Sequence, residues 1–239
     1  MHLARVTVFA GHFGSGKTSV AIAYAMWARR QRNRVTLCDL DIVNPYFRTT
    51  DAAEAMARAD IRLVASQYAN TNVDAPALPA ETRTIFDDEE VTGIIDLGGD
   101  DRGALALGRY AGLLQHGGEY EMLLVINQYR PLTRNIDDLR EIKNEIEAAC
   151  KVNFTGIVNN SNLGMETMLQ DVIKTAEFAA EASEKLELPL KMTALNRRLV
   201  HDKEAEEMAR AALGALFLLD LPDKQDWNRR RPAKEGLWR

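Results

Sequence analysis

Short apolar runs alternate with longer amphipathic stretches along most of the chain. The apolar runs are rich in β-branched residues, and several, such as VTGIIDL at Val91–Leu97, are apolar along most of their length. Strands of this composition are typical of parallel sheets that helices cover on both faces. We predict strands at Ala4–Ala10, Arg34–Leu40, Ile61–Ala65, Val91–Leu97, Tyr120–Asn127, Val152–Asn159 and Leu190–Ala194.

The stretches between these runs repeat their apolar residues with the period of an amphipathic helix. Helices are predicted at Lys17–Gln31, Thr50–Ala59, Ala80–Glu89, Arg102–Gln115, Thr133–Cys150, Met165–Leu186 and His201–Leu218. Regular alternation of strands and helices indicates an α/β fold, with three layers and a doubly wound, mostly parallel sheet.

The chain has 239 residues, enough for one large α/β domain with a sizeable core. We predict one domain over residues 1–220 and a polar, basic tail over residues 221–239. The tail holds several arginines and two tryptophans, but Pro232 and Gly236 interrupt a continuous helix there. We therefore expect a disordered tail or a partner-docking arm rather than a membrane anchor.

The composition argues against several classes of protein. A formal net charge of −5 gives no strong signal for nucleic-acid binding. Cys38 and Cys150 are far apart and the four histidines form no H-x-H or H-x-x-x-H pair, so no disulfide framework or Cys/His metal site is expected. No apolar run reaches membrane-spanning length, and the chain begins directly with a strand pattern. We therefore expect a cytoplasmic protein without a transmembrane segment.

GHFGSGKT, from Gly11 to Thr18, matches the pattern G-x-x-x-x-G-K-[ST]. It lies directly after a predicted strand and directly before a predicted helix, the context that a phosphate-binding loop requires. The glycines let successive backbone N–H groups turn toward one anion, and the helix N-terminus adds partial positive charge. Lys17 would contact the outer phosphates of a nucleotide, and the Thr18 hydroxyl would bind Mg²⁺. The predicted nucleotide contacts in this segment are Gly11, His12, Phe13, Gly14, Ser15, Gly16, Lys17, Thr18 and Ser19.

Acidic residues end two further predicted strands. Asp39 and Asp41 are separated by one residue, so both side chains can serve a single metal–phosphate site. Asp96 closes the strand IIDL, and Gly98 and Gly99 follow it. In an open α/β sheet the carboxyl ends of the strands border the ligand crevice. We therefore expect these residues to lie beside the phosphate loop.

GHFGSGKTS, CDLDIVNP, IIDLGG and GIVNNS together resemble the MinD/ParA/Mrp/ArsA-like ATPases. These are SIMIBI-class P-loop NTPases with the CobQ/CobB/MinD/ParA nucleotide-binding domain. By motif order the resemblance extends from Ala4 to about Asn160. It implies ATP and Mg²⁺ as cofactors.

The resemblance implies a role for each matching residue. Lys17 would be catalytic, and Asp41, in a first switch segment, would position or polarise the attacking water. Thr18, Asp39 and Asp96 would hold Mg²⁺, directly or through its water ligands.

The resemblance also implies which residues contact the terminal phosphate and the adenine ring of the nucleotide. Gly98 or Gly99 would contact the terminal phosphate. Asn159, at the end of FTGIVN, matches the asparagine that such families use on the adenine ring, with Asn160 as the alternative if the alignment shifts by one residue. A guanine site would need an Asn-Lys-x-Asp or Thr-Lys-x-Asp signature. This chain reads NNSN from Asn159 onward, so we expect ATP rather than GTP.

His12 departs from this resemblance. In the MinD, ParA and ArsA families the second residue of the loop is a lysine that reaches across a dimer to the partner's nucleotide. Three interpretations stay open for His12. In the first, nearby phosphates keep His12 protonated, so that it acts as a weaker cation than lysine. In the second, the catalytic cation comes from another residue, such as Arg48 or Arg102. In the third, hydrolysis is slow until a partner binds.

The sequence thus predicts an Mg²⁺-dependent ATP-binding protein and slow ATPase that acts as a nucleotide switch on an unidentified partner protein. The resemblance also implies a nucleotide-dependent homodimer. Other SIMIBI relatives leave two alternatives: an ATP-dependent ligase of the dethiobiotin synthetase or cobyrinate synthase type, and a metallochaperone or enzyme-maturation NTPase. A nucleotide sensor without hydrolysis is a further alternative.

Overall fold

A computed structural model describes residues 1–40, 50–65, 80–98 and 101–221 of the chain. In these ranges one sheet has eight strands in the order β3-β2-β4-β1-β5-β6-β7-β8, and every neighbouring pair is parallel. The strands are β1 Val6–Ala10, β2 Val35–Leu40, β3 Arg62–Ala65, β4 Thr92–Leu97, β5 Tyr120–Ile126, β6 Gly156–Asn159, β7 Leu190–Asn196 and β8 Leu216–Leu219.

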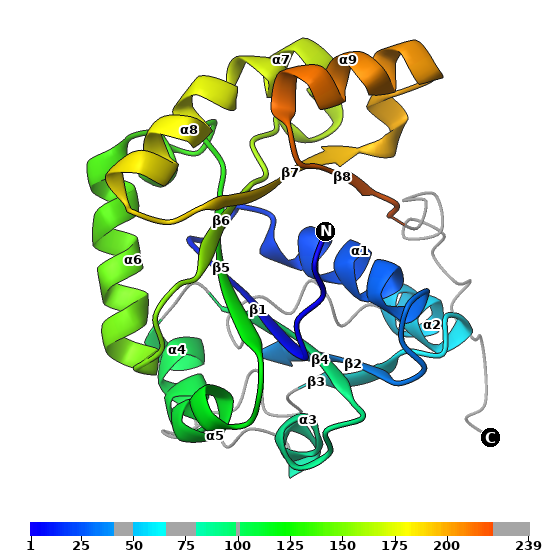
Figure 1. Ribbon diagram of the computed structural model, residues 1–239, viewed down its shortest axis with the longest axis vertical. Helices are drawn as coiled ribbons and strands as arrows, with labels where there is room; N and C mark the ends of the chain where they lie inside the picture. Colours follow the sequence, from blue (N-terminus) through cyan, green and yellow to red (C-terminus); the bar gives the residue numbers. More distant parts are fainter. Residues whose placement is uncertain (41–49, 66–79, 99–100, 222–239) are drawn as a thin grey trace, which may run out of the picture.

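Helices cover both faces of this sheet (Figure 1). Helices α1 and α2 lie on one face, and α4, α5, α6 and α8 lie on the other. The helices are α1 Lys17–Arg29, α2 Thr50–Arg58, α3 Thr84–Asp87, α4 Asp101–Gly108, α5 Ala111–His116, α6 Ile136–Cys150, α7 Leu169–Lys174, α8 Ala176–Lys185 and α9 Lys203–Leu213. Short 3-10 turns are formed by Ala80–Arg83, Pro131–Thr133, Gly164–Glu166 and Arg197–Leu199. The predicted α/β class with three layers and a parallel sheet is confirmed.

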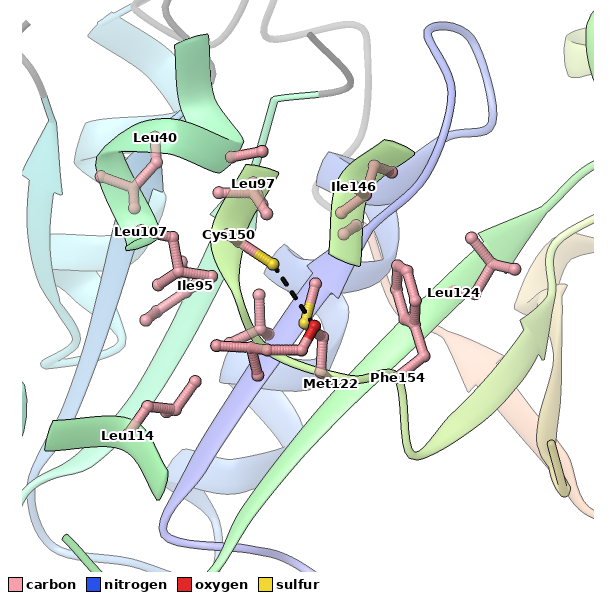
Figure 2. Packing of buried hydrophobic residues seen from close by; sticks show 14 of the residues in the cluster. Leu40, Ile95, Leu97, Leu107, Leu114, Met122, Leu124, Ile146, Cys150 and Phe154 are labelled. Atoms are coloured by element: carbon pink, nitrogen blue, oxygen red, sulfur yellow. Dashed lines mark hydrogen bonds between the residues drawn. The ribbon is translucent and has the colours of Figure 1, made fainter. Parts of the chain in front are cut away.

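Apolar cores on both faces of the sheet follow from the alternation of side chains along the strands. On β4, Ile94 packs in the core beneath α1, whereas Ile95 and Leu97 pack in the core beneath α4 and α6. Figure 2 shows the second core, where Ile95 and Leu107 lie beside Cys150 of α6. Burial raises the pKa of the Cys150 thiol, so the side chain stays neutral and acts as a small apolar residue.

The end of the described chain differs from the predicted helix His201–Leu218. Helix α9 ends at Leu213, and Gly214 follows it with φ 68°, a conformation that favours glycine. The apolar segment after it forms β8 instead, where Leu216 pairs with Thr193 of β7 and Phe217 packs beneath α1. The run LFLL is too short and too apolar for an amphipathic helical face, and it extends the parallel sheet by one edge strand.

Four other predicted elements are divided or shorter than expected. The predicted helix Ala80–Glu89 is a 3-10 turn followed by the short helix α3. The predicted helix Arg102–Gln115 is two helices, α4 and α5, and the predicted helix Met165–Leu186 is a 3-10 turn followed by α7 and α8. The predicted strand Val152–Asn159 begins only at Gly156. These errors are of boundary rather than of type, because short connecting turns do not interrupt the apolar period that a sequence displays.

No helix in the described ranges combines the length and the hydropathy that crossing a membrane requires. The predicted basic tail lies outside the described residues, apart from Leu221.

The close approach of α3 to the sheet yields a test of the fold. A Cβ on Gly93 of β4 would lie 2.2 Å from Cγ2 of the buried Ile85, so Gly93→Ala overpacks this contact. We expect the free energy of unfolding to fall by about 1–3 kcal/mol. A Cβ on Gly112 of α5 meets nothing within 4 Å, so Gly112→Ala serves as the control, with stability unchanged or raised by up to about 1 kcal/mol. Urea unfolding of the three proteins measures both effects, and equal stability of Gly93→Ala and wild type would contradict the packing.

Candidate functional site

Residues 11–16 link β1 to α1 as a tight loop over the N-terminus of that helix (Figure 1). Gly11 packs so closely on β5 that a Cβ there would lie 2.5 Å from the Val125 carbonyl oxygen. Gly16, at the N-cap of α1, has φ 83° and ψ 23°, in the left-handed region. Its carbonyl accepts the first helical hydrogen bond, from the Val20 N–H at 3.2 Å. The glycines therefore permit a tight loop that ends at the N-cap of α1.

Lys17 is the first residue of α1, and only 4% of it is exposed. Its Nζ donates to the His12 carbonyl oxygen across the loop, at 3.5 Å. A buried ammonium and the unpaired N–H groups of a helix N-terminus together make a strongly positive environment. Thr18 and Ser19, half-buried, follow on the first turn of the same helix. This arrangement can bind a multiply charged anion.

His12 and Phe13 form the outer part of the loop. The His12 ring is half-buried, and its Nδ1 lies 2.9 Å from the Phe13 carbonyl oxygen. Phe13 is 63% exposed. Ser15 is buried, and its N–H donates to the His12 carbonyl oxygen at 3.2 Å.

Two predicted carboxylates lie side by side at the same edge of the sheet. Asp39 of β2 pairs in register with Asp96 of β4, and Phe9 of β1 pairs with Asp96 on its other side. Cys38 and Leu40 belong to the core beneath α4 and α6, so Asp39 lies on the opposite, α1 face of the sheet. The same alternation places Asp96 on that face, where it is 1% exposed. Both carboxylates therefore lie on the side of the sheet from which α1 begins.

Cys38 is not available as a ligand on this face. Its Sγ lies 3.4 Å from Thr82 Oγ1 on the other side of the sheet. Burial, together with the nearby charges of Asp39 and Asp96, raises the pKa of the thiol to about 12. The thiol therefore stays protonated at neutral pH. In the described part of the chain no three or more His, Cys, Asp or Glu side chains gather as a metal-binding group.

Gly98 follows β4 and is buried against the start of α4. A Cβ on Gly103 of that helix would lie 3.0 Å from the Leu40 carbonyl oxygen and 3.1 Å from the Gly98 nitrogen. The ends of β2 and β4 and the first turn of α4 therefore meet at one place. Asp41 and Gly99 lie outside the described residues, as does Arg48, and the side chain of Arg102 is not described either.

The two predicted asparagines occupy different positions. Asn159 is fully buried: its Nδ2 donates to Thr175 Oγ1 at 3.0 Å, and its Oδ1 accepts from the Ser161 N–H and hydroxyl at 3.1 and 2.7 Å. These bonds hold the turn after β6. Asn160 instead reaches the phosphate loop, where its Nδ2 donates to the Ser15 carbonyl oxygen at 2.7 Å. It lies so close that a Cβ on Gly16 would be 2.3 Å from Nδ2.

A cavity of about 280 Å³ lies beside the loop. It borders the loop and α1 through Gly14, Gly16 and Ser19, and Asn160 lines it while Asn159 does not. The other lining residues come from the loops after β5, β6 and β7, from α7, from the end of β7 and from β8 and the residues after it: Arg130, Asn162, Gly164, Met165, Thr167, Val172, Ala194, Leu195, Asn196, Arg198, Leu199, Leu219 and Leu221.

The sequence reasoning missed two arginines of this cavity. Arg130, in the loop after β5, donates from Nε to the Gly14 carbonyl oxygen at 3.1 Å. Arg198, after β7, donates from Nη2 to the carbonyl oxygens of Gly164 and Met165 at 2.8 and 2.9 Å. Both follow the carboxyl ends of strands, the one signal that could have indicated them. No aspartate or glutamate lies among the described residues that line the cavity.

Comparison of the sequence with known proteins gives no match to any family model and none to a curated protein. Comparison of the structure does give matches. FtsY from Thermotoga maritima aligns with a TM-score of 0.55 at 18% identity, over 85% of this chain and 67% of that chain. Chloroplast FtsY from Physcomitrella patens aligns with a TM-score of 0.53 at 17% identity, over 87% and 65%.

FtsY from Elizabethkingia anophelis, solved in complex with GDP, aligns with a TM-score of 0.53 at 15% identity, over 90% of this chain and 65% of that chain. The chain thus spans about two thirds of the length of these FtsY structures. At such identities the likeness concerns the fold alone. The chain has the fold of the SIMIBI-class P-loop NTPases.

Proposed function

We propose that this chain is an Mg²⁺-dependent ATP-binding protein and slow ATPase that acts as a nucleotide switch on a partner protein. One observation carries the proposal. The buried Lys17 and the glycine loop lie at the N-terminus of α1, on the face of the sheet that also bears the adjacent carboxylates Asp39 and Asp96. The similarity of the fold to FtsY, of which one structure holds GDP, supports a nucleotide as the ligand.

The phosphate groups would lie in the loop. Its N–H groups, the partial charge of α1 and the Lys17 ammonium would stabilise the negative charge on a transferred phosphoryl group. Thr18, Asp39 and Asp96 would hold Mg²⁺, which neutralises charge on the phosphates when bound. Gly98 or Gly99 would contact the terminal phosphate, and Asp41 would orient the attacking water.

The cavity beside the loop would take the nucleobase. Guanine presents N–H donors that a carboxylate accepts well, as in Asp-containing guanine signatures, whereas adenine combines one amino donor with acceptor nitrogens. The described lining has the amides of Asn160 and Asn162 but no carboxylate. Amides both donate and accept, which suits adenine. Because Asn159 is bonded to Thr175 and Ser161 and does not line the cavity, whereas Asn160 lines it beside the loop, we propose Asn160 as the asparagine nearest the nucleotide.

Hydrolysis of ATP is the first test of this proposal. We expect free phosphate from ATP in the presence of Mg²⁺ and none with a chelator. Lys17→Ala removes the buried ammonium, so it should abolish phosphate release and weaken ATP binding by about tenfold to a hundredfold. The exposed Lys174 supplies the matched control, and Lys174→Ala should behave as wild type. Undiminished ATP binding by Lys17→Ala would contradict the assignment of the loop.

Product analysis also separates the competing functions. Phosphate released only with a carboxylic acid co-substrate would indicate a ligase of the dethiobiotin synthetase or cobyrinate synthase type. ATP binding with no phosphate release under any condition would indicate a sensor. A metallochaperone or maturation NTPase would hydrolyse nucleotide and also bind a transition metal, for which the described residues offer no Cys/His cluster.

Base preference is the second test. Competition binding should show ATP bound about tenfold or more tightly than GTP. Asn162→Asp introduces a carboxylate into the cavity lining and should narrow this ratio, because the new acceptor suits guanine. Asn162→Ala removes the same amide without adding a carboxylate and should leave the preference for ATP in place. A preference for GTP in the wild-type protein would refute adenine recognition.

A nucleotide-dependent homodimer through this edge is part of the proposal. Large apolar side chains are exposed on the loops that surround the site: Phe13, Leu132, Leu163, Met165 and Met168. Apolar side chains gathered around a charged site are typical of surfaces that another protein covers. A second copy of this chain, bound across the nucleotide, would bury them.

Light scattering after size exclusion tests the dimer. We expect the mass to double with Mg²⁺ and a non-hydrolysable ATP analogue. Met168, 67% exposed and outside the cavity lining, gives the variant Met168→Lys, which should prevent the doubling by placing a charge in the interface. Met208 on α9, 48% exposed and outside the cavity lining, gives the control Met208→Lys, which should dimerise normally. A monomer mass in all conditions at high protein concentration would contradict the homodimer and leave a different protein as the partner.

A further inference from the structure

We infer that Arg130 is a phosphate-binding residue of this site, and that it supplies, from within one chain, the permanent positive charge that His12 does not. This inference rests on the proposed function, because it assumes that the loop binds a nucleotide.

The position of Arg130 carries the inference. Its Nε donates to the carbonyl oxygen of Gly14, in the middle of the phosphate loop, at 3.1 Å. A Cβ on Gly14 would lie 3.5 Å from Nε and 3.9 Å from Cζ, so the guanidinium packs directly on this glycine. Arg130 also lines the cavity with Gly16 and Ser19, the residues on either side of Lys17 and Thr18. It therefore lies where the phosphates of a bound nucleotide would pass from the loop toward the cavity.

Hydrogen bonds on both sides of Arg130 fix the loop that holds it. The Arg130 N–H donates to the Asn127 carbonyl oxygen at 3.0 Å, and the Arg130 carbonyl accepts from the Thr133 N–H at 3.0 Å. The buried Thr133 hydroxyl donates to the Asn127 carbonyl oxygen as well, at 2.5 Å. Tyr129, next to Arg130, donates from its hydroxyl to the Asp171 carbonyl oxygen at 2.8 Å. A backbone held in this way lowers the entropy that Arg130 would lose on binding a ligand.

The chemistry of the side chain fits a phosphate. A guanidinium carries five N–H donors and keeps its charge at any physiological pH. One donor is engaged by Gly14, which orients the group and leaves the Nη atoms as further donors. Arg130 is exposed, and no carboxylate lies among the described residues that line the cavity beside it. Its charge is therefore not matched there by an acid, and paired N–H donors suit phosphate oxygens.

Neither His12 nor Arg198 combines a permanent charge with a side-chain contact to the phosphate loop. An imidazole has no permanent charge, unlike a guanidinium, and the His12 Nδ1 already lies 2.9 Å from the Phe13 carbonyl oxygen. The Nη2 of Arg198 is engaged by two carbonyl oxygens of the loop after β6, away from the phosphate loop. Arg130 is the described arginine that contacts the phosphate loop through its side chain.

Binding of ADP, measured by calorimetry, tests the assignment. Arg130→Ala should weaken ADP binding by about tenfold to a hundredfold, the loss expected for hydrogen bonds between charged groups. Arg130→Lys keeps the charge but not the paired donors, so it should restore part of the loss. Arg134, an exposed arginine four positions along that does not line the cavity, gives the control Arg134→Ala, which should bind as wild type.

Competition by pyrophosphate distinguishes a phosphate contact from a contact with the base. If Arg130 binds phosphate, the competition constant of pyrophosphate, measured by displacement of ADP, should be weaker for Arg130→Ala than for wild type. An equal competition constant for the two proteins, or unchanged ADP affinity in Arg130→Ala, would overturn the inference while leaving the proposed function intact. Failure of the wild-type protein to bind ATP or ADP would instead remove the proposed function, and this inference with it.

Discussion

The geometry of the loop between β1 and α1 is the constraint on which the rest of the site depends. Its N–H groups can converge on an anion only if its carbonyl groups find partners elsewhere. Two neighbouring loops provide these partners: Arg130 donates to the Gly14 carbonyl oxygen and Asn160 to the Ser15 carbonyl oxygen. These two bonds join the loop to the segments that follow β5 and β6. Within the loop, Lys17 Nζ donates to the His12 carbonyl oxygen. The loop, Arg130, Asn160 and Lys17 thus form one connected hydrogen-bonded unit.

The sheet explains why these groups meet. Its order brings β4 between β1 and β2, so that Asp96 lies next to both Phe9 and Asp39 in register. All neighbouring strands in the described sheet are parallel, so the loops that follow β1, β5, β6 and β7 emerge at one edge. A ligand bound there would contact segments that are far apart in the chain. Such a ligand can therefore bias the positions of several loops at once, which is what a nucleotide switch requires.

The sequence alone predicted the strands and helices well where the apolar period was long and continuous. It failed at LFLL, read as the end of a helix, because four apolar residues carry no period and Gly214 was read as part of the helix. It also could not separate Asn159 from Asn160, since both are asparagines at the end of one strand. The difference between them is a matter of hydrogen-bond partners: Thr175 for one and Ser15 for the other.

What the sequence determined by itself is the position of the glycine-rich loop between a strand and a helix, the acidic strand ends and the α/β class, because each depends on local spacing and on the residues next to it in the chain. Only the tertiary structure decided which distant residues join that loop. Arg130 lies 116 positions after Gly14 in the chain, and no local sequence pattern indicates that the two residues are in contact. Its place follows from the parallel order of β1 and β5, which sets the two loops side by side. Long-range pairing of strands is encoded in the packing of the whole sheet rather than in any short segment.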